Sequence, residues 1–170
     1  MDAAAALGGW QEILLRLGAA TAIGCVLGLN REIHGKPAGL RIHGLVCLGA
    51  SLLVLSSLQL TLGTTALDSS AVLRTVQGII SGIGFLGGGV ILRDDSHHSV
   101  HGLTTAASVW VVACLGIACG LGLWLTALTA LALTLTVLIV GGRIETVIRG
   151  RFGPQPGAED NGAGARRPLV

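Results

Sequence analysis

The chain has 170 residues, of which 51% are hydrophobic and 12% are charged, and its formal net charge is +2. A soluble domain carries about a quarter charged residues, so this composition, with a mean hydropathy of +0.76, excludes an ordinary water-soluble domain. We expect no nucleic-acid partner. The composition instead predicts a protein whose main solvent is the lipid bilayer.

Long apolar stretches divide the chain. A transmembrane helix needs about 20 predominantly apolar residues to cross the hydrocarbon core, and five stretches satisfy this requirement, at about residues 13–29, 44–62, 74–92, 102–118 and 123–141. We therefore predict an all-α protein whose five transmembrane helices form one domain over residues 1–149. Residues 150–170 are rich in glycine, proline and charge, which predicts a disordered tail.

The distribution of charge predicts the orientation in the membrane. Most of the 11 basic residues fall in the link after the first stretch, at Arg93, or after the fifth stretch. The positive-inside rule then places the N-terminus outside, the C-terminus in the cytoplasm, and Trp10 and Trp124 at the outer interface. Arg16 lies within the first stretch, one helical turn after Glu12, so we expect these two side chains to form an ion pair.

The four cysteines, Cys25, Cys47, Cys114 and Cys119, all lie inside apolar stretches, and no C-x-x-C pair is present. Free cysteine in such a setting behaves as a small hydrophobic residue. The pattern predicts packed thiols, in preference to a disulfide framework or a zinc site.

The third stretch contains GIGFLGG, which matches the G-x-G-x-x-G loop of dinucleotide-binding domains. That loop needs a strand before it, a helix after it and an acid about 20 residues further on. Here the sequence stays apolar on both sides, and the acid is missing because that position falls within 103–109. The glycines instead predict a helix face that a neighbouring helix can approach closely.

We expect this glycine face to place the third helix at the centre of a tight bundle, so that leucine at any of its glycines would disrupt assembly. A locally broken helix at an ion site is the alternative. The same spacing of small residues occurs at Ala20, Gly24 and Gly28 and at Gly116 and Gly120. The candidate packing residues of the third helix are Gly78, Gly82, Gly84, Gly87, Gly88 and Gly89.

The remaining charged residues gather at the ends of the stretches. On the cytoplasmic side we expect Glu32 to pair with Arg41 or Arg93 within a polar cluster, and on the outer side we expect Asp68 to meet Arg74. For both clusters the alternative is a salt bridge that only anchors helix ends. The candidate members of the cytoplasmic cluster are Arg31, Glu32, Arg41, Arg93, Thr104 and Thr105.

Histidines are concentrated before the fourth stretch, where His97, His98 and His101 form H-H-x-x-H beside Asp94 and Asp95. Such a group can bind a transition metal or respond to pH, but an exposed polar loop is the favoured interpretation. No nucleophile, base and orienting acid occur in register, so we expect no catalytic residues and no enzymatic activity.

Three motifs occur in order: Asn30-Arg31-Glu32 leading to AGLRIH at 38–43, GIGFLGGGVI at 82–91 and HGLTTAASVW at 101–110. On these motifs the chain resembles the MgtC/SapB family of bacterial inner-membrane proteins over about residues 13–141. It departs from the family pattern, with Asn30 for Glu, Ile42 for Thr, Gly88 for Ala and His101 for Arg. Glu32 is then the only acid of its cluster, which weakens the case for a cation site there.

The resemblance implies a role in growth or survival when magnesium is scarce and, in some members, in virulence. Many relatives carry a soluble C-terminal domain, and we expect this chain to be too short to hold one. Two functions follow. In the first, the protein binds and modulates another membrane complex or a second copy of itself.

In the second, it is a direct Mg²⁺ transporter or channel. Mg²⁺ prefers an octahedral shell of oxygen ligands, and a conducting path needs carboxylates or a ring of carbonyls. Such a path would be lined by Glu32 and Asp68, at the membrane edges, or by the backbone of the third helix, and no acidic residue lies between the edges, so we favour the first function. Mg²⁺ is the one bound ion that the resemblance implies, and the lipid bilayer is the surrounding partner.

Overall fold

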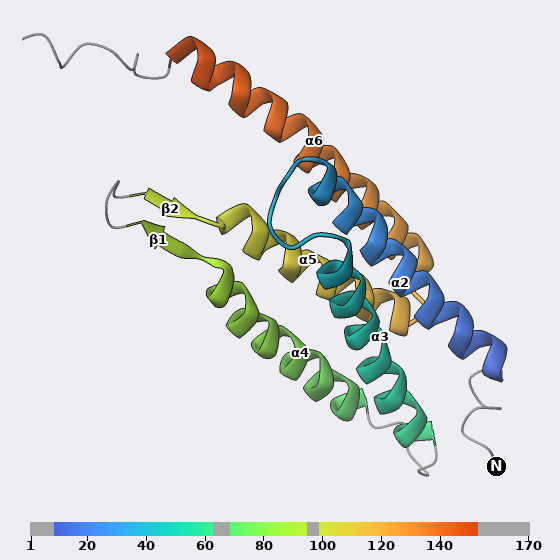
Figure 1. Cartoon of the computed structure of the whole chain (residues 1–170). Coiled ribbons are helices and arrows are strands. Elements are labelled where there is room, and N and C mark those ends of the chain that lie inside the picture. The colour runs from blue at the N-terminus through green and yellow to red at the C-terminus, as the bar shows by residue number, and fades with distance from the viewer. Residues whose placement is uncertain (1–8, 63–68, 95–98, 153–170) are drawn as a thin grey trace, which may run out of the picture. The chain divides into compact units, whose positions relative to one another are not determined.

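The computed structural model describes residues 9–62, 69–94 and 99–152. Its five helices are α2 (Trp10–Ile33), α3 (Leu40–Leu62), α4 (Ser69–Val90), α5 (Leu103–Gly120) and α6 (Trp124–Phe152) (Figure 1). Each is long and apolar enough to cross a membrane. The prediction of a five-helix membrane protein is therefore confirmed.

Several helices extend past their apolar stretches. The helix α2 continues past the predicted end at Leu29 to Ile33, because the first residues that disfavour a helix are Gly35, with φ +62°, and Pro37. The helix α6 continues to Phe152, past the predicted end at Gly141. Hydropathy marks the part of a helix that lies in hydrocarbon, whereas turn-forming residues determine where the helix ends.

A short hairpin separates α4 from α5. Strand β1 (Leu92–Asp94) pairs antiparallel with β2 (Ser99–His101), with Leu92 opposite His101. Gly102, with φ +90°, turns the chain into α5, and a Cβ atom there would collide with the carbonyl group of Val90. His101 of the H-H-x-x-H motif ends β2, whereas His97, His98 and the His101 side chain lie outside the described residues.

The helices α3 and α5 form the centre of the bundle. The helix α3 contacts α2, α4 and α5, and α5 contacts α2 and α4 as well (Figure 1). An apolar core joins α3, α4 and α5 through Val54, Ile83 and Val109. All four cysteines are free, as predicted, and Cys47 and Cys119 are fully buried within this region.

Glycines permit the closest contacts of α3. A Cβ atom added to Gly24 would lie 2.5 Å from the His43 carbonyl oxygen, and one added to Gly28 would lie 2.6 Å from Leu40 Cα. On α5, Gly116 and Gly120 lie against the backbone of Cys47 and Ser51. The small-residue spacings predicted to pack in the first and fourth helices are therefore real contacts between helices.

The prediction that the third helix is the centre of the bundle is wrong for this chain. The helix α4 turns Ile79 and Ile83 toward α3 and α5, because branched side chains gain more packing contacts than glycine does. Gly87 makes only an ordinary contact, 3.7 Å from Ala106 Cβ. No neighbouring atom lies within 4 Å of a Cβ added to any of the other five, which are Gly78, Gly82, Gly84, Gly88 and Gly89.

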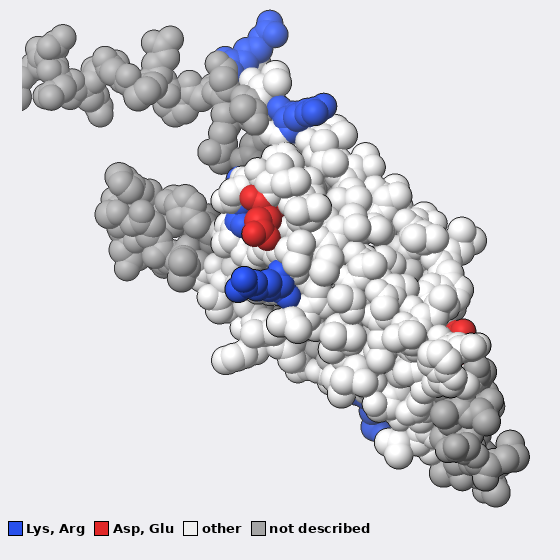
Figure 2. Space-filling model, turned by 45° about the vertical axis from the view of Figure 1, so that its right-hand side comes forward, with Lys and Arg blue, Asp and Glu red and all other residues white. Residues whose placement is uncertain are grey.

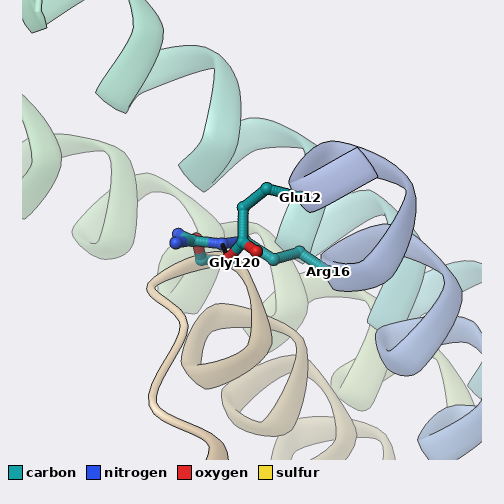
Figure 3. A network of polar contacts seen from close by, with 3 residues as sticks. All are labelled: Glu12, Arg16 and Gly120. Atoms are coloured by element: carbon teal, nitrogen blue, oxygen red, sulfur yellow. Dashed lines mark hydrogen bonds and ion pairs between the residues drawn. The ribbon is translucent and has the colours of Figure 1, made fainter. Parts of the chain in front are cut away.

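An arginine ties α2 to the end of α5. Arg16 Nε donates a 2.7 Å hydrogen bond to Glu12 Oε1, which confirms the predicted ion pair, and Arg16 Nη1 donates a 2.9 Å bond to the Gly120 carbonyl (Figure 3). The last carbonyls of a helix lack partners within it and carry partial negative charge. Arg16 satisfies one of them inside the membrane edge.

Large apolar side chains cover much of the helix surface. Phe85, Leu125 and Leu60 are 85%, 81% and 76% exposed. On the face shown in Figure 2, charged side chains lie near helix ends and the surface between them is uncharged. Exposed apolar surface on this scale requires a nonpolar solvent, so the chain is a multi-pass membrane protein.

The described residues fall into two units, with the boundary between Leu135 and Thr136, inside α6. In the first unit α6 buries Ala127 and exposes Leu128. In the second unit Val137 and Val140 are exposed on the same helix.

We predict that Gly24→Leu abolishes the accumulation of folded protein, because the new side chain would overlap the backbone of α3 at a cost of about 3 kcal/mol or more. Gly18→Leu on the same helix is the matched control, since nothing lies within 4 Å of its Cβ position. The measurement is the amount of monodisperse protein extracted from membranes. Equal amounts for the two variants would contradict the packing described above.

Candidate functional site

A buried polar cluster lies where the end of α2 meets the beginnings of α3 and α5. Its central residue is Arg31, which is only 2% exposed. Arg31 donates hydrogen bonds from Nη2 and Nε to the Pro37 carbonyl, at 3.2 and 3.4 Å, and from Nη2 to Thr105 Oγ1. The guanidinium thus connects α2, the loop after it and α5.

The Arg31 guanidinium is hydrogen-bonded to neutral oxygen atoms and not to a carboxylate of the described residues. Among the side chains that the structure describes, the only ion pair is Arg16 with Glu12, so Arg31 is a buried cation held by a carbonyl and a hydroxyl. Transferring a charge out of water costs several kcal/mol unless hydrogen bonds replace its hydration. The Pro37 and Thr105 oxygens supply that replacement. Loss of either acceptor would therefore lower the stability of this part of the bundle.

His43 extends the cluster along α3. Its side chain is fully buried, with Nδ1 3.1 Å from the Gly39 carbonyl and Nε2 3.1 Å from Ser108 Oγ. In a neutral imidazole protonated on Nδ1, Nδ1 donates to Gly39, and Nε2 accepts from Ser108 only when the Ser108 hydroxyl points toward it. Ser108 Oγ also lies 2.8 Å from the Thr105 carbonyl, so its single proton serves one of two acceptors.

Glu32 has a structural partner. Its side chain is exposed, and its Oε2 accepts a 3.0 Å hydrogen bond from the Leu40 backbone N–H at the start of α3. A carboxylate at this position satisfies an unpaired donor and complements the helix dipole. The expected pairing of Glu32 with Arg41 is wrong, because Arg41 is exposed and forms no ion pair with any described side chain.

The predicted residues are only partly brought together. Arg31 and Thr105 are in contact, whereas the neighbouring Thr104 is exposed. The Arg93 side chain lies outside those that the structure describes, and so does Asp68. Arg74 is exposed near the beginning of α4, at the other end of the bundle.

Two residues of the cluster, His43 and Ser108, are absent from the predicted set. His43 follows Gly39 by one helical turn and belongs to an apolar span, and an ionisable residue in such a span is a functional candidate by default. That signal was present in the sequence. The contact with Ser108 depends on how α3 and α5 pack, which no local pattern gives.

A metal site is not formed by the described part of the chain. Within it, no group of three or more His, Cys, Asp or Glu side chains is arranged to hold an ion. Mg²⁺ prefers six oxygen ligands, whereas Glu32 offers one carboxylate that already accepts from Leu40. Asp68, the other candidate ligand, lies outside the described residues.

Known proteins match most of this chain. The MgtC family model matches residues 17–147. Protein SrpB of Synechococcus elongatus is 38% identical over 146 residues, covering 82% of this chain and 80% of that protein. Protein MgtC of Salmonella typhimurium is 42% identical over 127 residues, covering 75% of this chain but 51% of its own length. Protein SapB of Bacillus subtilis is 39% identical over 84% of this chain and 60% of its own length.

None of the solved structures is a significant match to this chain. The chain covers most of SrpB and about half to three fifths of MgtC and SapB. The residues that the family model matches, 17–147, run from α2 to α6.

We predict that Thr105→Val lowers the stability of the protein by about 1–3 kcal/mol, because it leaves a buried Arg31 donor without its acceptor. Thr104→Val is the matched control and should change stability by less than about 0.5 kcal/mol, since Thr104 is exposed. Thermal unfolding of the two purified variants in detergent, followed by circular dichroism, measures the difference. Equal unfolding temperatures for the two variants would show that the contact of Thr105 with Arg31 does not stabilise the protein.

Substitution of Glu32 separates capping from cation binding. Glu32→Gln keeps an acceptor oxygen for the Leu40 N–H and should retain most of the stability, whereas Glu32→Ala should lose about 1 kcal/mol. Added Mg²⁺ should not raise the unfolding temperature of either the original protein or the Gln variant. A Mg²⁺-dependent rise that Glu32→Gln abolishes would make Glu32 a cation ligand.

Proposed function

This chain belongs to the MgtC family, and from that premise we propose that it serves magnesium or ion homeostasis in the bacterial inner membrane. It does so by binding and modulating another membrane protein complex, or a second copy of itself, and without catalysing a reaction. Its activity supports growth when magnesium is scarce.

The exposed face of α4 carries this proposal. Glycines on α2 and α5 lie against α3 at Gly24, Gly28, Gly116 and Gly120, whereas Gly78, Gly82 and Gly89 on α4 have no neighbour within 4 Å. Small residues let transmembrane helices approach closely and gain dispersion contacts that lipid does not supply as well. A partner helix on α4 would use the same kind of contact that the chain uses within its own core.

The polar end of the bundle supports regulation over transport. The buried guanidinium of Arg31 places a positive charge between α2, α3 and α5. This charge would repel a divalent cation that approached this end of the bundle. Glu32, the one acid of the cluster, accepts from a backbone N–H. These contacts favour a rigid structural end over a path for Mg²⁺.

We propose the orientation with the N-terminus outside and the C-terminus in the cytoplasm. The Arg16 contact with Gly120 holds the start of α2 beside the end of α5, so Trp10 and Trp124 belong to the same end of the bundle. Indole rings favour the membrane interface. Arg31, Lys36 and Arg41 belong to the opposite end of α2 and α3, which supports placing that end in the cytoplasm.

We predict that Gly82→Leu leaves folding intact but impairs growth in low magnesium, because the side chain has room within the chain and obstructs only an external helix. The expected loss of partner retention is about tenfold, for an overpacking cost of roughly 1–3 kcal/mol. The measurement is rescue of a deletion strain at equal amounts of membrane protein, with Gly18→Leu as the exposed control on α2. Full rescue by Gly82→Leu would show that the partner does not bind the glycine face of α4.

Flux measurements address the transport alternative. Liposomes containing the purified protein should take up Mg²⁺ no faster than protein-free liposomes. Uptake above that level that Glu32→Gln abolishes would overturn the regulatory proposal and identify a transporter.

A further inference from the structure

A groove lies between the last turns of α3 and the first turns of α4, away from the polar cluster around Arg31. It has a volume of about 470 Å³ and opens at the protein surface. The helix α3 contributes Leu53, Ser56, Ser57, Leu60 and Thr61 to its walls, and α4 contributes Ala71, Arg74 and Thr75.

The groove has hydrogen-bond donors that the protein itself does not use. Ser57 is only 8% exposed, yet among the described residues its hydroxyl has no hydrogen-bond partner, and neither has that of Ser56. By contrast, Thr61 donates to the Ser57 and Leu58 carbonyls and Thr75 donates to that of Ala71. The Ser56 and Ser57 hydroxyls line the groove and can donate to an acceptor bound within it.

An arginine and two leucines line the groove together with these hydroxyls. Arg74 is exposed on α4 and lines the groove, so a guanidinium stands at its rim. Leu53 and Leu60 are 53% and 76% exposed on α3. The lining of the groove therefore combines a guanidinium and hydroxyls with apolar side chains.

The depth of the groove matches the interface of a bilayer. The apolar span of α3 ends at Thr61 and that of α4 begins at Ser70, so Ser57 and Arg74 lie about one turn inside the membrane edge. Arginine at such a position directs its charge toward the headgroup layer. A groove at this depth lies where lipid headgroups meet acyl chains.

We propose that this groove binds an anionic phospholipid. The phosphate accepts hydrogen bonds from the Ser56 and Ser57 hydroxyls and pairs with the Arg74 guanidinium, while an acyl chain lies along Leu53. Guanidinium and phosphate form strong charge-assisted hydrogen bonds, and basic sites between transmembrane helices are a known setting for acidic headgroups. The leucine wall distinguishes a lipid from free phosphate, which shares only the anionic chemistry.

Native mass spectrometry of the full-length protein tests this proposal by counting retained lipids. Phosphatidylglycerol should be retained more strongly than phosphatidylcholine of the same chain length. Arg74→Gln should reduce that preference about fivefold, and Ser57→Ala should reduce phosphatidylglycerol retention about tenfold. Arg74→Lys should restore part of the preference, and Arg143→Gln, which alters an exposed arginine of α6, should leave it unchanged.

Three results would overturn the proposal. The first is equal retention of the two lipids by the original protein, and the second is an equal effect of Arg74→Gln and Arg143→Gln. The third is a cysteine cross-link from position 56 to a second copy in lipid-containing membranes, which would assign the groove to that copy. Displacement of the lipid by inorganic phosphate alone would show a phosphate site that needs no acyl chain.

Discussion

The close approach of α3 to its two neighbours is the constraint on which the rest of the structure depends. Gly24 and Gly28 bring α2 against its backbone, and Gly116 and Gly120 bring α5 against it as well. A methyl group at any of these positions would overlap backbone atoms. Because lipid removes the hydrophobic drive between helices, such contacts hold the bundle together.

Each end of this three-helix unit is fixed by an arginine that binds backbone carbonyl oxygen. Arg16 binds Gly120 at one end, and Arg31 binds Pro37 at the other. Both satisfy carbonyls that helix ends and turns leave without partners. The polar residues of the chain are thus used first to close helix ends, and the surface left for other functions lies on α4 and in the groove beside it.

The sequence was sufficient to predict the number of helices, because apolar length and the scarcity of charge are properties of each segment alone. It also predicted the Glu12–Arg16 pair, which is set by helical spacing. It failed for the glycines of α4, since spacing identifies a smooth face without specifying what covers it. The contact of His43 with Ser108 was equally out of reach, because those residues are 65 positions apart and meet only when α3 and α5 pack.

The order of the helices along the chain has a consequence for biosynthesis. The central helix α3 makes its closest contacts with α2, which precedes it, and with α5, which follows only after α4 and the hairpin. A nascent chain that has released α2, α3 and α4 can form only half of the core. Closure of the core therefore waits for α5, whose Gly116 and Gly120 pack against the carbonyl groups of Cys47 and Ser51.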